Sequence, residues 1–225
     1  MLLCDIEGTT TSIAFVYETL FPYAAQAAEA FLAAHGDNPE VALACARIHQ
    51  DATAEESQLG GLATVLAVVR RQMAGDVKAT GLKQLQGLIW RHGYETGAIH
   101  GHVYADVPEV FRAAQSVGVA IFSSGSILAQ QLLFRYSSAG DLTTLIRAYF
   151  DTTSGAKEQA ASYHGIAKHL GLSTAAIIFA TDRPAEAEAA LSAGCTACLI
   201  MRPGNPPLPA LQRCTIYPDL RSIVN

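Results

Sequence analysis

Between residues 108 and 201 the chain alternates between short apolar runs and stretches with helical spacing, and this alternation constrains the fold more than any other feature. The runs carry no polar residue at every second position, so they predict strands that are buried on both faces. Strands of this kind, joined by helices, form an α/β fold with a parallel sheet covered on both sides. We expect strands at 1–6, 118–122, 149–150, 176–180 and 197–201, and helices at 109–117, 127–136, 157–170 and 184–193.

A long segment between the first strand and the alternating region is helical throughout. Residues 17–35 are rich in alanine and have apolar residues at helical spacing. Residues 39–90 predict three or four further helices, punctuated by Gly60-Gly61 and Gly75. We therefore expect two domains: an α/β core formed by residues 1–19 and 101–225, and a helical cap inserted at residues 20–100.

The composition indicates a folded protein and excludes some partners. Half of the 225 residues are apolar and 16% are charged, which is ample material for a core. The net charge is −5 and no Lys/Arg cluster occurs, so we expect no nucleic-acid partner. The apolar stretches are too short or too interrupted to span a membrane, and the N-terminus lacks the basic region of a signal peptide. We expect a cytoplasmic protein without a membrane partner.

Two short motifs can be interpreted either as metal-binding or redox sites or as purely structural residues. Cys195 and Cys198 form a C-x-x-C, but the pair begins a strand, no second pair follows, and an odd total of five cysteines is unlike a disulfide framework. We interpret both as buried core residues. His100 and His102 have no third ligand at a suitable spacing, so we interpret them as two exposed histidines of a loop.

Polar residues occur at four places that converge on the same edge of the sheet: three follow predicted strands, and Lys157 lies where a loop enters a helix. Because the carboxyl ends of parallel strands meet at one edge, side chains placed there lie close together. Each feature alone is common, as a turn, a helix cap or a surface charge, but their joint occurrence predicts a site. The features are Asp5 and Glu7, Ser123-Ser124-Gly125-Ser126, Lys157, and Thr181-Asp182.

The residue types match the needs of phosphoryl transfer. A carboxylate such as Asp5 can attack phosphorus, and Glu7, two residues on, can protonate the leaving oxygen and later deprotonate water. Serine hydroxyls and free N–H groups at a helix start, here at Ser123 and Ser124, suit phosphate oxygens. A lysine, here Lys157, supplies positive charge. Asp182, together with Asp5, offers hard oxygen ligands for Mg²⁺.

The order of these residues resembles the haloacid-dehalogenase superfamily of phosphohydrolases, whose core is a Rossmann-like parallel sheet with a cap insertion. In that superfamily a nucleophilic Asp, an acid two positions later, a Ser/Thr, a Lys and a final acid recur in this order. Longer strings are similar to the enolase-phosphatase E1 family of methionine salvage. They are DIEGTTTSIAFVYETLFPYA (5–24), IFSSGSILAQQLLFRYSSAGDL (121–142), FDTTSGAKEQAASY (150–163), ATDRPAEAEAA (180–190), MRPGNPPL (201–208) and the cap string LKQLQGLIWRHGYETG (82–97).

The resemblance implies a monomeric, Mg²⁺-dependent enzyme with two activities. It would enolise 2,3-diketo-5-methylthiopentyl-1-phosphate and then dephosphorylate it, through an aspartyl-phosphate, to the acireductone. Its small-molecule partner would be this phosphorylated diketone. The residue that takes the carbon-bound proton stays open between Glu7 and Lys157. By position, the family's metal ligands match Asp5, Glu7 and Asp182, its phosphate contacts Ser123, Ser124 and Lys157, its catalytic residues Asp5, Glu7 and Lys157, and a further acid Glu186.

Three alternatives share the fold. A generic sugar-phosphate phosphatase or phosphomutase would use the same core residues, because the fold does not set the substrate. A dehalogenase needs neither the acid at Glu7 nor a magnesium ligand at Asp182. A non-catalytic phosphate-binding module would not need all the ionisable residues of the reaction, and they are present. The cap string at 82–97 favours the enolase-phosphatase.

Overall fold

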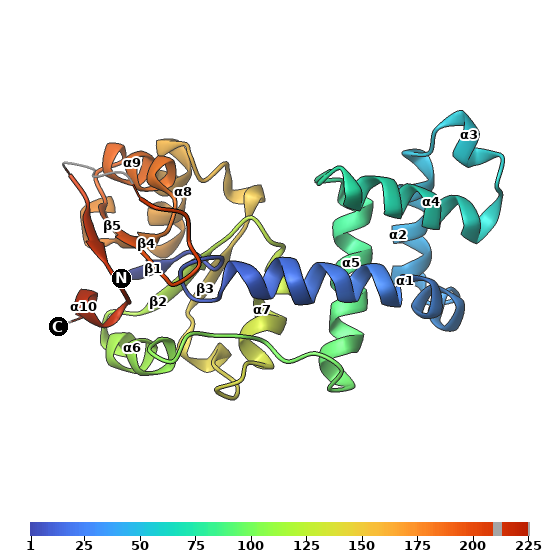
Figure 1. Ribbon diagram of the computed structural model, residues 1–225. Helices are drawn as coiled ribbons and strands as arrows, with labels where there is room; N and C mark the ends of the chain where they lie inside the picture. The colour runs from blue at the N-terminus through green and yellow to red at the C-terminus, as the bar shows by residue number, and fades with distance from the viewer. Residues whose placement is uncertain (209–212, 225) are drawn as a thin grey trace. The chain divides into compact units, whose positions relative to one another are not determined.

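The computed structural model describes residues 1–208 and 213–224 (Figure 1). The chain forms two compact units. One contains residues 1–16 and the chain from His100 onward, and the other contains residues 17–99.

The α/β unit is built on one parallel sheet, which confirms the predicted fold class. Its described strands follow the order β3-β2-β1-β4-β5-β6, so successive strands run outward from β1 in one direction and then from β4 in the other. The order reverses between β1 and β4, and in doubly wound folds ligands bind at the carboxyl ends of the strands at this point. The strands are β1 (Leu2–Cys4), β2 (Val119–Phe122), β3 (Ala148–Phe150), β4 (Ile178–Thr181), β5 (Thr196–Ile200) and β6 (Thr215–Tyr217).

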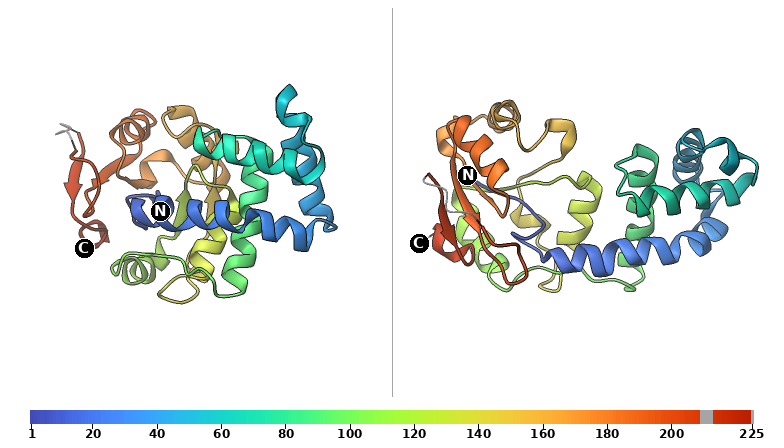
Figure 2. Two further views of the ribbon diagram at one scale, coloured as in Figure 1. Left: turned by 45° about the vertical axis from the view of Figure 1, so that its right-hand side comes forward. Right: turned by 45° about the horizontal axis from the view of Figure 1, so that its top comes forward.

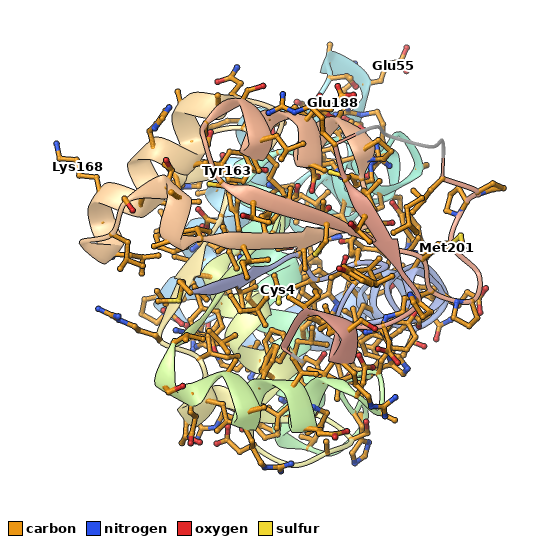
Figure 3. All side chains as sticks on the ribbon, turned by 90° about the vertical axis from the view of Figure 1, so that its left-hand side faces the viewer. Cys4, Glu55, Tyr163, Lys168, Glu188 and Met201 are labelled. Atoms are coloured by element: carbon orange, nitrogen blue, oxygen red, sulfur yellow. The ribbon has the colours of Figure 1, made fainter. Side chains whose placement is uncertain are left out.

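Helices cover both faces of this sheet (Figure 1). They are α6 (Val107–Ala113), α7 (Ile127–Arg135), α8 (Ala160–Leu170), α9 (Pro184–Ser192) and α10 (Arg221–Val224), with short 3-10 turns η2 (Ala114–Ser116), η3 (Thr143–Leu145), η4 (Thr152–Ser154) and η5 (Thr174–Ala176). Side chains alternate along each strand, so Leu3 packs with α8 and α9 while Leu2 and Cys4 pack with α6 and α7. In Figure 3 Cys4 and Tyr163 lie among other side chains, whereas Lys168 of α8 points outward.

The second unit is entirely helical. It contains the end of a π-helix, η1 (Phe15–Leu20), followed by α1 (Phe21–His35), α2 (Pro39–Gln50), α3 (Ala54–Ser57), α4 (Gly61–Ala74) and α5 (Thr80–Glu95), seen from two further directions in Figure 2. Two glycines of α5 allow close packing: a Cβ at Gly81 would lie 2.9 Å from Ile48 of α2, and one at Gly93 would lie 2.6 Å from Tyr23 of α1. The indole N–H of Trp90 donates to the carbonyl of Leu20 (2.8 Å). These contacts hold α5 against both neighbours.

Some predicted boundaries are wrong. The first strand ends at Cys4 rather than at residue 6, and α8 begins at Ala160 rather than at residue 157. Asp5 therefore directly follows a strand, and Lys157 lies in a turn that precedes α8. Strand β6 was not predicted. It has only three residues and follows a proline-rich stretch, so its sequence shows no periodic pattern. Within the part of the chain that the structure describes, no helix is long and apolar enough to cross a membrane.

Candidate active site

Buried polar residues gather where β1, β2 and β4 end. Asp5 directly follows β1, and its backbone N–H donates to the carbonyl of Ala180 in β4 (2.9 Å). The buried members are Asp5 (4% exposed), Ser123 (4%), Lys157 (7%) and Asp182 (7%). Polar groups at this depth need partners, because burial without them is costly.

Lys157 lies between two carboxylates. Its Nζ is 2.5 Å from Asp5 Oδ1 and 2.7 Å from Glu186 Oε2. The hydroxyl of Thr181, the last residue of β4, donates to the same Glu186 oxygen (2.8 Å). Burial alone would lower the pKa of Lys157, but the charges of Asp5 and Glu186 outweigh it and raise the pKa above its ordinary value. The lysine is therefore held as a cation.

The turn that carries Lys157 is fixed by α8. The phenol of Tyr163 donates to the Lys157 carbonyl (2.7 Å), and the hydroxyl of Ser162 donates to the Ala156 carbonyl (2.6 Å). Gly155 has φ +113°, and a Cβ there would lie 3.1 Å from the Cβ of Ser162. This turn needs glycine on both counts. The lysine ammonium is thus directed at Asp5 by contacts behind it.

Gly8 brings the loop after β1 against Asp182. Its φ is +70°, and a Cβ at this position would lie 2.7 Å from the carboxyl carbon of Asp182. The glycine is required both by the left-handed conformation and by the close approach. The loop that carries Asp5 and Glu7 is therefore packed against Asp182. Glu7 itself is half-buried.

The cluster carries more negative than positive charge. Burial raises the pKa of Asp182 to about 7, and repulsion from Asp5 and Glu186 adds to this. The pKa of Glu186 is also raised, first by burial and then by Asp5, against the opposing effect of Lys157. One lysine does not balance three carboxylates, and a bound divalent cation would.

The residues present fit a magnesium ion that takes only one or two of its ligands from the protein. Mg²⁺ is usually held by one or two carboxylates, with water and substrate phosphate completing its coordination. Asp5 and Asp182 offer such a pair. Within the described residues, no three His, Cys, Asp or Glu side chains are grouped so that they alone could hold a metal. Direct ligation by Glu7 stays a prediction.

The serines predicted to contact phosphate lie in the loop after β2. Ser123 is anchored by its N–H to the Phe150 carbonyl of β3 (3.1 Å), and its hydroxyl accepts from the N–H of Gly125 (3.2 Å). Ser124 is exposed. Ser126 caps α7 by accepting from the N–H of Ala129 (3.3 Å). The serines thus stand at the start of a nine-residue helix.

Gln130 of α7 is a supporting residue that the sequence reasoning missed. Its side-chain amide donates to the carbonyls of Gly125 (2.8 Å) and Phe150 (2.9 Å). It therefore ties the serine loop to the end of β3. A buried glutamine within ILAQQLLF is the signal that could have drawn attention to it, because an amide on an apolar helix face needs a partner.

Of the two motifs given a structural reading, one prediction is confirmed and one is partly wrong. Cys195 and Cys198 are buried and free, and burial raises their pKa to about 11 and about 12, so neither is a thiolate at neutral pH. His100 is exposed, but His102 is half-buried. Its Nδ1 accepts from the N–H of Ser12 (3.1 Å) and lies 2.9 Å from the hydroxyl of Thr11. This contact joins segments 90 residues apart, which a sequence motif does not reveal.

Comparison with known proteins agrees with this geometry. The family model described as haloacid dehalogenase-like hydrolase matches residues 1–194. Enolase-phosphatase E1 of Synechococcus elongatus is 48% identical over 212 residues, covering 91% of this chain and 89% of that protein. Enolase-phosphatase E1 of Drosophila melanogaster is 42% identical and covers all of this chain and 93% of its own length.

The chain belongs to the enolase-phosphatase E1 family of haloacid dehalogenase-like hydrolases. As a member of this family it is an enzyme, and phosphatases of the superfamily generally depend on magnesium.

Solved structures give one close likeness and several distant ones. The UTR4 protein of Saccharomyces cerevisiae superposes with a TM-score of 0.84 at 36% identity and covers 99% of this chain and 98% of its own. The L-2-haloacid dehalogenase of Xanthobacter autotrophicus reaches 0.55 at 14% identity, with 99% and 96% covered. The second likeness concerns the fold alone, so a dehalogenase reading gains nothing from it.

Proposed function

We propose that this protein is a magnesium-dependent enolase-phosphatase of methionine salvage. It enolises 2,3-diketo-5-methylthiopentyl-1-phosphate and then dephosphorylates the product to the acireductone. The observation that carries the proposal is the buried Asp5–Lys157 pair, 2.5 Å apart at the end of β1, in a chain of this family. The protein acts as a cytoplasmic monomer on this small phosphorylated diketone. Light scattering checks its mass in solution.

Asp5 is the nucleophile of the phosphatase step. One of its carboxylate oxygens attacks phosphorus, and the bond between phosphorus and the ester oxygen breaks, giving an aspartyl-phosphate. Lys157 opposes the repulsion between the anionic carboxylate and the anionic phosphate, because its charge is held 2.5 Å from Asp5. Glu186 holds the lysine from the other side and orients it.

Glu7 is the acid and base of the same step. It gives its proton to the departing ester oxygen and then takes one from the water that attacks the aspartyl-phosphate, which releases phosphate and restores Asp5. Its place two residues after Asp5, beyond the end of β1, supports this role. The loop between Gly8 and Thr11 holds its backbone by a hydrogen bond from the Gly8 N–H to the Thr11 carbonyl (2.8 Å).

Substrate phosphate binds to Ser123, Ser124 and Lys157. The two serines precede α7, whose first N–H groups and helix dipole favour an anion. Asp5 and Asp182, with Glu7 in the predicted set, would hold the magnesium. When bound, the ion supplies positive charge that neutralises the excess negative charge of the carboxylates and of the phosphate oxygens.

For the enolisation step the structure favours Glu7 over Lys157 as proton acceptor. Lys157 carries its proton between two carboxylates, with a raised pKa, and is a poor base in that state. Glu7 therefore takes the carbon-bound proton next to the carbonyl. The helical unit, residues 17–99, is the cap domain and sets the choice of substrate.

A paired assay tests the proposal. Purified protein with Mg²⁺ and the diketo phosphate ester is followed for inorganic phosphate and for the ultraviolet absorbance of the enolised product. Both signals should rise, and Asp5→Asn should stop phosphate release while the protein stays folded. Phosphate released from ordinary sugar phosphates, with the diketo ester untouched, would move the function to a generic phosphatase. Phosphate binding without any turnover would indicate a non-catalytic module.

A further inference from the structure

The loop after β5 holds the backbone of the loop after β1. In Arg202, Nε and Nη2 both donate to the carbonyl of Thr9, at 3.0 and 2.9 Å. The side-chain amide of Asn205 donates to the preceding carbonyl, that of Gly8, at 2.8 Å. Two successive carbonyls that follow Glu7 are thus fixed by one segment of the chain, which lies about 190 residues further on.

The guanidinium of Arg202 is itself held in one orientation. Nη1 and Nη2 donate to the two oxygens of Asp106 (2.8 and 2.9 Å), and the N–H of Leu220 donates to the same carboxylate (2.9 Å). Its face lies over the ring of Tyr104, 4.2 Å from the ring centroid. Arg202 is 5% exposed and Asp106 is 3% exposed. The planar fork therefore has little freedom to move.

The loop between Asp5 and Thr11 transmits this constraint. The N–H groups of Thr10 and Thr11 both donate to the Ile6 carbonyl (2.9 Å each), and the hydroxyl of Thr10 donates to the Asp5 carbonyl (3.1 Å). Glu7 lies inside this closed turn. A shift of the Thr9 carbonyl would therefore move Glu7 more readily than Asp5, which is also anchored to β4 through its N–H.

The buried ion pair of Arg202 and Asp106 is not explained by stability alone. Taking a guanidinium and a carboxylate out of water is expensive, and well-packed apolar residues often stabilise a core as well or better. What a bidentate fork adds is a fixed direction, here towards one backbone carbonyl. Neither Arg202 nor Asp106 has a role in the chemistry described above.

We propose that Arg202 is a positioning residue for Glu7: it holds the loop after β1 so that Glu7 stays in reach of the leaving oxygen. This inference rests on the proposed function, in which Glu7 is the general acid. Its consequence is specific. A general acid matters greatly for an alkyl leaving group, which departs as a strongly basic alkoxide, and little for p-nitrophenolate, which leaves without a proton.

The test compares Arg202→Lys with wild type on two substrates, the diketo phosphate ester and p-nitrophenyl phosphate. Lysine keeps the charge beside Asp106 but lacks the fork that reaches the Thr9 carbonyl. We expect kcat/KM to fall about 100-fold for the alkyl ester and less than about 3-fold for p-nitrophenyl phosphate. Glu7→Gln should also lose more on the alkyl ester than on p-nitrophenyl phosphate, with an added loss on both esters from its part in holding the metal. Arg147→Lys, an exposed arginine at the amino end of β3, is the matched control and should change neither value.

Folding is kept apart from positioning by a second variant. Arg202→Met combined with Asp106→Leu removes both buried charges, should remain folded by circular dichroism, and should show the same selective loss. Equal losses on the two esters, or no loss in Arg202→Lys, would overturn the inference while leaving the proposed function intact. Wild-type protein inert towards both esters would overturn the proposed function and the inference together.

Discussion

Lys157 illustrates how one residue acquires a role from its surroundings. A lone lysine in a sequence is usually a solvated surface charge, but this one is 7% exposed and is shared between Asp5 and Glu186. Its ammonium also lies 6.0 Å from the ring centroids of Phe122 and Phe179, so little water reaches it. In such surroundings a fixed charge acts strongly on its neighbours, because screening is weak.

We expect Lys157→Met to lower both activity and stability. The substitution leaves Asp5 and Glu186 buried without their cation, which should cost about 3 kcal/mol of unfolding free energy at pH 8 and more than 100-fold in phosphate release. Without Lys157 the already raised pKa of Glu186 rises further. The folded variant then binds more protons than the unfolded chain, so its stability should improve as the pH falls towards 5.

Urea unfolding at pH 8 and pH 5 measures this effect. A Lys157→Met protein whose loss of unfolding free energy relative to wild type is the same at both pH values would contradict this account. Unchanged turnover would contradict it as well.

Asp182→Asn should make the metal-free protein more stable. The pKa of Asp182 is raised to about 7 in the folded state. Between the ordinary value near 3.9 and this one the folded state binds more protons, so stability falls as the pH rises. Removing the carboxylate should therefore add on the order of 4 kcal/mol at pH 8 in EDTA and nothing near pH 4. Activity should be lost.

A thermal shift with Mg²⁺ completes this test. Magnesium should raise the Tm of the wild type, because it neutralises the same surplus of charge, and should have little effect on Asp182→Asn. A variant that is less stable than wild type in EDTA at pH 8 would contradict the predicted repulsion.

At the scale of elements, the loop after β1 is shaped by contacts from β4 and from the loop after β5. Gly8 has no room for a side chain, because a Cβ there would meet the Asp182 carboxyl group and would lie 3.0 Å from the side-chain nitrogen of Asn205. Strand β1 is only three residues long, so most of the geometry of Asp5 and Glu7 comes from these neighbours and not from β1 itself.

Gly8→Ala should abolish most activity, with Gly171→Ala as its matched control. Both glycines have φ +70°, so an alanine at either is strained by about 1 kcal/mol. No atom lies within 4 Å of a Cβ at Gly171, whereas a Cβ at Gly8 meets the Asp182 carboxyl group. Phosphate release should fall at least 100-fold in Gly8→Ala only, with about 2 kcal/mol of additional destabilisation. Equal activity in the two variants would show that the close approach has no catalytic consequence.

At the scale of the whole molecule, the α/β unit has its own core on both faces of the sheet, and the two segments at which the helical unit is inserted are joined to each other. Besides the contacts of His102 with Thr11 and Ser12, the N–H of Tyr104 donates to the Thr10 carbonyl (3.0 Å). The pKa of His102 is lowered, first by burial and then by Arg202, so the ring is neutral and its Nδ1 accepts at neutral pH.

Replacing residues 17–99 by a short glycine-serine linker should leave a folded α/β unit. Residues 11 and 102 are already in contact, so the loop to be closed is short. We expect cooperative thermal unfolding, continued hydrolysis of p-nitrophenyl phosphate and loss of more than about 10-fold in selectivity for the diketo ester over it, as proposed for a cap that sets the substrate. A fragment that unfolds, or one that keeps its selectivity, would contradict the proposed division into core and cap.

Much of the fold could be read from local pattern. The apolar runs around β2, β4 and β5 are continuous, and their helices carry a 3.6-residue period, so a parallel sheet followed from sequence alone. The placement of Asp5, Ser123 and Asp182 at strand ends followed too, because the carboxyl ends of parallel strands share one edge.

The tertiary structure decided which of these residues meet and what holds them. Asp5 and Lys157 are 152 residues apart, and Arg202 and Asp106 are 96 apart. Periodicity and turn signals report the conformation of a few neighbouring residues, whereas these pairs depend on strand order and on how far each loop leans over the sheet. The sequence by itself thus determined the fold class and the kinds of residue at the sheet edge. The sharing of Lys157 by two carboxylates, the raised pKa of Asp182 and the contact of Arg202 with the loop after β1 arose from tertiary packing. Charges that are far apart in the sequence act strongly on one another only when the fold buries them side by side.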